Sequence, residues 1–138
     1  MRERCPSARF VSVAKLPDHR LAFTRNSKNR GCGVADVIGT TGHDVWGVVY
    51  EIIDPEDVER LDRFEGVPSG AYVRNDSQQV FLRGEPEQPE EASIYFAVRE
   101  DNPPLPNAEY KSLLVGGARF WQLPAAYIQE LEQITVKR

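Results

Sequence analysis

Residues that build metal sites and covalent cross-links are scarce in this sequence. Its 138 residues include two cysteines, Cys5 and Cys32, and two histidines, His19 and His43. The cysteines have no CxxC spacing, and the histidines stand apart beside turn-forming residues, so no metal-ligand set is visible. We therefore expect neither a metal nor a cofactor.

Long apolar runs and a basic excess are also missing. No stretch approaches the ~18 consecutive apolar residues of a membrane-spanning helix, and the opening MRERCPSARF has no apolar core of a secretory signal. The formal net charge is −4, with Lys and Arg spread among acidic residues, whereas nucleic-acid binders usually show a basic stripe. We expect a cytoplasmic protein that contacts neither membrane nor nucleic acid.

The chain is long enough for one domain, which we expect to span residues 1–138. Hydrophobic residues make up 41% of the sequence, enough to form a core. Alternating apolar residues and turn-forming residues predict strands at 10–14, 21–24, 34–38, 45–53, 71–74, 77–82 and 92–98. The nearly continuous apolar run 45–53 predicts a central strand that is covered on both faces.

Three helices are expected among these strands. The first has Asp54 as its cap and Gly66 as its terminator, the second begins at Asn107 and reaches Gly116 or beyond, and the third covers about 124–134. The order of elements shows no regular βα alternation. It predicts an α+β fold: a mixed β-sheet or small β-barrel flanked by helices.

Glu65 occupies an unusual place on the first helix. It continues the apolar stripe of Val58 and Leu61 toward the core, whereas Glu59 and Asp62 fall off that stripe and should face solvent. Burial and the negative end of the helix dipole would both raise the pKa of Glu65, as a general acid/base requires. In the alternative interpretation the helix frays early and Glu65 points into solvent.

Five segments of the sequence form a recognisable series: 8–23 (ARFVSVAKLPDHRLAF), 44–50 (DVWGVVY), 61–67 (LDRFEGV), 69–73 (SGAYV) and 106–110 (PNAEY). In order and in spacing they resemble motifs of the γ-glutamylcyclotransferase-like (AIG2-like) family. Each segment is weak by itself, but together they cover nearly the whole chain.

The resemblance implies an enzyme that converts a γ-glutamyl peptide or amine into 5-oxoproline and a free amine. It assigns Glu65 the role of proton shuttle and implies that Gly70, Tyr72 and Tyr110 bind the substrate. Each tyrosine can also be interpreted as a core residue with one satisfied hydroxyl. Surface cations such as Arg25 could attract an anionic substrate, but such charges are usually only solvated.

One family motif has no counterpart in the sequence. The family opens with a strand and a YGSN loop, whose backbone amides form an anion nest for the substrate carboxylate. Its absence suggests a chain that is N-terminally truncated relative to the family. It leaves open an alternative function, a catalytically impaired binding or regulatory module on the same fold. A missing strand would expose a sheet edge, which a partner chain in a homodimer could cover.

Overall fold

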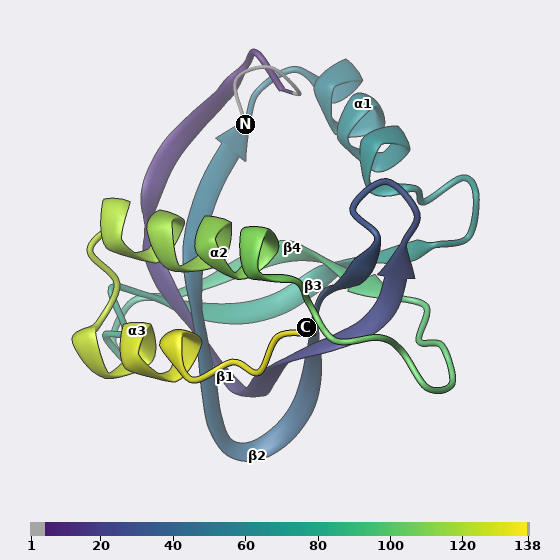
Figure 1. Cartoon of the computed structure of the whole chain (residues 1–138). Coiled ribbons are helices and arrows are strands. Elements are labelled where there is room, and N and C mark those ends of the chain that lie inside the picture. The colour runs from purple at the N-terminus through teal and green to yellow at the C-terminus, as the bar shows by residue number, and fades with distance from the viewer. Residues whose placement is uncertain (1–4, 138) are drawn as a thin grey trace.

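Two long paired strands dominate the fold. The structure is a computed structural model that describes residues 5–137. In this range an antiparallel sheet has the strand order β2-β1-β3-β4, and helices flank it (Figure 1). The elements are, in chain order, β1 (Ala8–Ser27), β2 (Cys32–Ile52), α1 (Pro55–Glu65), β3 (Tyr72–Leu82), β4 (Pro89–Ala97), α2 (Ala108–Phe120) and α3 (Ala125–Glu132). The expected α+β class, a sheet flanked by helices, is confirmed.

β1 and β2 form one bent ribbon in place of four short strands. The pairing register shifts between Pro17 and His19, where Asp18 adopts a left-handed φ of 57°. The Oδ1 atom of Asp18 accepts a hydrogen bond from the backbone N–H of Gly42 at 3.1 Å. The segments between the predicted strands, 15–20 and 39–44, therefore bend a continuous ribbon, as β-bulges do.

A second bulge replaces the turn that was expected within 71–82. The register of β3 against β4 shifts between Asn75 and Gln78. The Nε atom of Arg74 donates to Asp76 at 2.9 Å across this irregularity. β3 is consequently one strand, because side-chain bonds stabilise the bulge without reversing the chain.

Helix α1 forms as the sequence predicts. The Oδ1 atom of Asp54 accepts a bond from the N–H of Glu56 at 3.0 Å, and Gly66 ends the helix with a φ of 81°. A left-handed glycine is the usual helix terminator because it has no Cβ to clash. Gly66 therefore fixes where Glu65 lies, one residue before the chain turns away.

Helices α2 and α3 lie side by side across the β1–β2 ribbon (Figure 1). The cap of α2 is confirmed, since the Oδ1 atom of Asn107 accepts a bond from the N–H of Tyr110 at 2.8 Å. The apolar faces of the two helices form the main core cluster, which consists of Val115, Ala118, Leu123, Tyr127 and Leu131. No helix in the described range is both long and apolar enough to cross a membrane.

Strand β2 is not the central strand that its apolar run predicts. It pairs with β1 and stands at one end of the strand order. Its apolar residues are explained by contacts on two sides: Val45 and Trp46 pack against the α2–α3 cluster, while Val45 and Val49 pack against the cluster formed by Ala14, Leu16 and Val80. Helices and the rest of the sheet thus cover an end strand here, whereas the apolar run predicted a central strand covered on both faces.

Candidate functional site

Tyr72 and Tyr110 meet at the backbone of one residue of β2, Ala35. The hydroxyl of Tyr110 accepts a hydrogen bond from the N–H of Ala35 at 3.0 Å, and the hydroxyl of Tyr72 donates to the carbonyl of Ala35 at 3.4 Å. The N–H and the C=O of Ala35 therefore both point away from β1. The two phenols take the place that a neighbouring strand would fill at this edge.

Glu65, the last residue of α1, is half-buried beside these phenols. Burial, the phenol of Tyr110 and the charge of Glu65 together raise the pKa of Tyr72 to about 12. Burial, chiefly, and the charge of Glu65 also raise the pKa of Tyr110. One carboxylate thus acts electrostatically on both tyrosines, and three residues from α1, β3 and α2 form one cluster, hereafter the Glu65 cluster.

Asp62 does not face solvent, contrary to the sequence-based prediction. It accepts a hydrogen bond from Nη1 of Arg74 at 2.7 Å and from the hydroxyl of Tyr95 at 2.5 Å. These bonds join α1 to β3 and β4, one helical turn before Glu65. The ion pair fixes the end of α1 against the sheet, and no local pattern around Asp62 indicates partners 12 and 33 residues away.

Gly70 lies in the turn between α1 and β3 with a φ of 81°. A Cβ built on Gly70 would meet nothing within 4 Å, so the turn requires its left-handed conformation and not its small size. Gly70, Tyr72 and Val98 line an open cavity of about 330 Å³. The structure thus places Gly70 beside Tyr72, at the rim of the Glu65 cluster.

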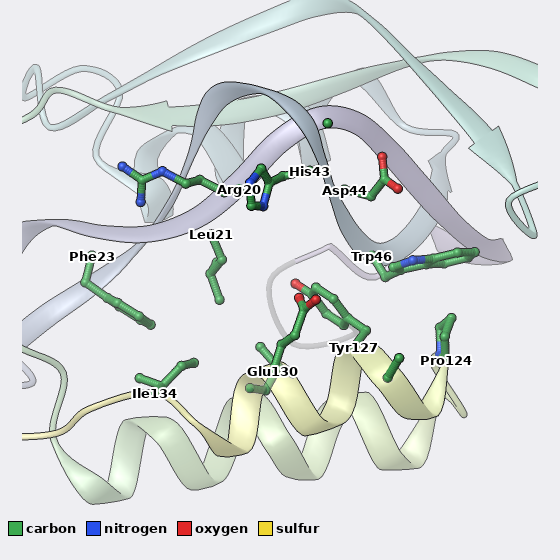
Figure 2. Close-up of a pocket in the computed structure, with 13 residues that line it drawn as sticks. Arg20, Leu21, Phe23, His43, Asp44, Trp46, Pro124, Tyr127, Glu130 and Ile134 are labelled. Atoms are coloured by element: carbon green, nitrogen blue, oxygen red, sulfur yellow. The ribbon is translucent and has the colours of Figure 1, made fainter.

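A second cavity, of about 340 Å³, lies between α3 and the bend of the β1–β2 ribbon (Figure 2). Figure 2 shows Tyr127 and Glu130 pointing from α3 toward the side of the cavity that contains His43. Phe23 connects it to the Glu65 cluster, because Phe23 lines the cavity and its ring lies edge-on to Tyr110 at 6.2 Å between centroids. Neither Glu65 nor Tyr72 lines this cavity, and no sequence motif indicates it.

Metal ligands are not gathered anywhere in the described part of the chain. No group of three or more His, Cys, Asp or Glu side chains between residues 5 and 137 could hold a metal ion. The Glu65 cluster offers instead one carboxylate, two phenols and the backbone of Ala35. Such groups can bind a small polar molecule and transfer protons to it.

The fold and the site define a small α+β protein with a half-buried carboxylate beside two phenols at a sheet edge. A profile of the AIG2-like family matches residues 44–131. Gamma-glutamylcyclotransferases from Bos taurus and from Homo sapiens are each 33% identical, over 95% of this chain and 69% of their own length. A solved structure titled "Gamma-glutamyl cyclotransferase" superimposes with a TM-score of 0.88 at 29% identity, over 99% of this chain and 80% of that one. The chain belongs to the AIG2-like, γ-glutamylcyclotransferase-like family.

Proposed function

We propose that the protein is a γ-glutamyl cyclotransferase that converts a γ-glutamyl peptide or amine into 5-oxoproline and a free amine. The proposal is supported by family membership and by one arrangement of side chains. The hydroxyls of Tyr72 and Tyr110 both bond to Ala35, and the charge of Glu65 acts on both phenols. A proton-transfer group and two hydrogen-bonding groups therefore belong to one cluster.

The reaction needs proton transfers to and from the same place. Glu65 takes a proton from the substrate's α-ammonium group, and the resulting amine attacks the γ-carbonyl carbon to form a tetrahedral intermediate. Protonated Glu65 then gives that proton to the departing nitrogen, and the original amide C–N bond breaks. The ring nitrogen loses its second proton, which the released amine takes up. The products are 5-oxoproline and an ammonium ion, and Glu65 returns to its carboxylate form. Binding the substrate in a folded shape supplies the proximity for this intramolecular attack.

The two phenols suit different tasks in this scheme. Tyr72, with its pKa raised to about 12, is protonated at neutral pH and makes only a long bond to the Ala35 carbonyl. Its hydroxyl can therefore turn to the γ-carbonyl oxygen, where negative charge develops. The hydroxyl of Tyr110 accepts a hydrogen bond from the N–H of Ala35. This bond fixes the phenol oxygen and leaves the hydroxyl proton free to be donated to the substrate.

The test is release of 5-oxoproline from γ-glutamyl dipeptides and γ-glutamyl amines by the wild type and Glu65→Gln. Glu59→Gln, an exposed change on the same helix, is the matched control. Loss of a general acid/base typically lowers turnover about 10²–10⁴-fold, so Glu65→Gln should lose release while Glu59→Gln keeps it. Full turnover in Glu65→Gln would refute the proton-shuttle role.

We also propose that the chain acts as a single domain in the cytoplasm, in glutathione-related metabolism. Cys32 is fully buried and forms no disulfide, which suits a reducing compartment. A homodimer through the end strand β2 is a further proposal, supported by the tendency of free strand edges to pair. Sedimentation velocity over a range of concentrations tests it, and a single monomeric species throughout would exclude it.

A further inference from the structure

Two guanidinium groups border the Glu65 cluster. The Nη1 atom of Arg25, near the end of β1, donates to the carbonyl of Val98 at 3.0 Å, and Val98 lines the same cavity as Tyr72 and Gly70. The guanidinium carbon of Arg30, in the β1–β2 turn, lies 5.0 Å from the ring centroid of Tyr110. Each arginine is thus held beside one of the two phenols.

Both arginines act on the tyrosines that Glu65 also affects. The charge of Arg25 lowers the pKa of Tyr72, against the larger upward effect of burial. The charge of Arg30 lowers the pKa of Tyr110 in the same way. Positive and negative groups therefore act on the same two phenols.

Two other carboxylates of this region bond to groups other than Arg25 and Arg30. Fully buried Asp36 pairs with Arg99 at 3.2 Å. The carboxylate of Glu100 accepts a bond from the N–H of Asn26 at 2.6 Å.

The backbone also holds Arg30 in place. The side-chain amide of Asn107, the cap of α2, donates to the carbonyl of Arg30 at 3.2 Å. Lys137 donates to the carbonyl of the next residue, Gly31, and adds a third positive charge beside the turn. The turn is therefore fastened to the start of α2, three residues from Tyr110.

We propose that Arg25 and Arg30 form the subsite for the α-carboxylate of a γ-glutamyl substrate, opposite Glu65. This inference rests on the proposed function and names its substrate class: compounds that retain both the ionised α-carboxylate and the α-ammonium group. The ammonium faces the carboxylate of Glu65, and the α-carboxylate faces the guanidiniums. Arginine suits this task because its planar fork binds carboxylates through two parallel hydrogen bonds.

The experiment compares two ligands, γ-glutamyl-alanine and its α-carboxamide counterpart, by isothermal titration calorimetry. The proteins are the wild type, Arg25→Gln, Arg30→Gln, Arg25→Lys and the control Arg20→Gln. Arg20 is an exposed cation of β1 that lines the other cavity. If the wild type consumes γ-glutamyl-alanine, all five proteins are compared in a Glu65→Gln background.

We expect the wild type to prefer the carboxylate ligand, and Arg25→Gln or Arg30→Gln to lose about tenfold to a hundredfold of that affinity. Arg25→Lys, which keeps the charge, should recover part of the loss, and Arg20→Gln should bind as the wild type does. Equal affinity of the wild type for both ligands, no detectable binding of either, or an unchanged preference in both Gln variants would overturn the subsite.

Parallel measurement of 5-oxoproline separates this inference from the proposed function. Preferential binding without any release would remove the enzymatic proposal and keep the carboxylate subsite. Release that is equally fast from carboxylate and carboxamide substrates would keep the enzyme and remove the subsite. The two ideas therefore fail on different measurements.

Discussion

The hydroxyl of Tyr110 should contribute to folding as well as to binding, and Tyr110→Phe tests both. This substitution removes the hydroxyl oxygen, which accepts a hydrogen bond from the N–H of Ala35 at 3.0 Å. Because β2 is an end strand and this N–H bonds away from β1, it loses its partner in the variant. Leaving a buried donor unsatisfied costs about 1–3 kcal/mol, and because this bond is only partly buried, the lower part of that range applies. For a domain of 138 residues the full range corresponds to a fall in Tm of roughly 3–10 °C.

Tyr72→Phe provides the matched comparison. The hydroxyl of Tyr72 donates to the carbonyl of Ala35 at the longer distance of 3.4 Å, where a hydrogen bond is weak. We expect this variant to lose less than about 1 kcal/mol of the free energy of unfolding. Both variants should lower turnover, since both phenols lie beside Glu65.

Urea unfolding at neutral pH, followed by circular dichroism, measures the two free energies. The geometry requires Tyr110→Phe to be the more destabilised variant. Equal stability of the two variants, or a larger loss in Tyr72→Phe, would refute the assignment of the Ala35 N–H to Tyr110. An unchanged turnover in Tyr110→Phe would make this residue a core tyrosine only.

The remaining predictions concern stability. Gly33→Ala should be strongly destabilising, because its Cβ would overlap the carbonyl oxygen of Pro104; Gly116→Ala, whose Cβ meets nothing within 4 Å, should instead stabilise α2 by about 0.5–1 kcal/mol. Urea midpoints of the two variants that move in the same direction would contradict this. Hydrogen bonds from Ser7 hold the pKa of buried Asp57 below 3.8, so its stabilising effect is present above that pH and is lost as pH falls through the lower folded value. Asp57→Asn should therefore flatten the acid side of the stability curve, and an unchanged acid midpoint would speak against it.

The sequence predicts those parts of the fold that depend on neighbouring residues. Asp54 and Gly66 bound α1 because each acts on backbone groups within its own helical turn. Asn107 caps α2 for the same reason. These local interactions are visible in a single sequence, and they place Glu65 at the end of its helix.

Other features depend on residues that are distant in the sequence. Turn-forming residues at Asp18 bend a ribbon because β2 supplies a bonding partner 24 residues away. Asp62 was predicted to face solvent because its partners, Arg74 and Tyr95, lie 12 and 33 residues away on two strands. The role of Ala35 has no sequence signal at all, since only its backbone contacts the tyrosines.

An enzyme and a non-catalytic binding module would use the same charges differently. A module needs only the complementarity between a zwitterionic ligand and the groups of Glu65, Arg25 and Arg30. An enzyme also needs a carboxylate that exchanges a proton during each turnover, so Glu65→Gln should stop release while the protein still binds γ-glutamyl-alanine. If the wild type binds this ligand and releases no 5-oxoproline from any substrate, the same site is a receptor. In either case Glu65→Gln should weaken binding, because the carboxylate holds the ammonium group, and only the loss of release distinguishes the enzyme from the receptor.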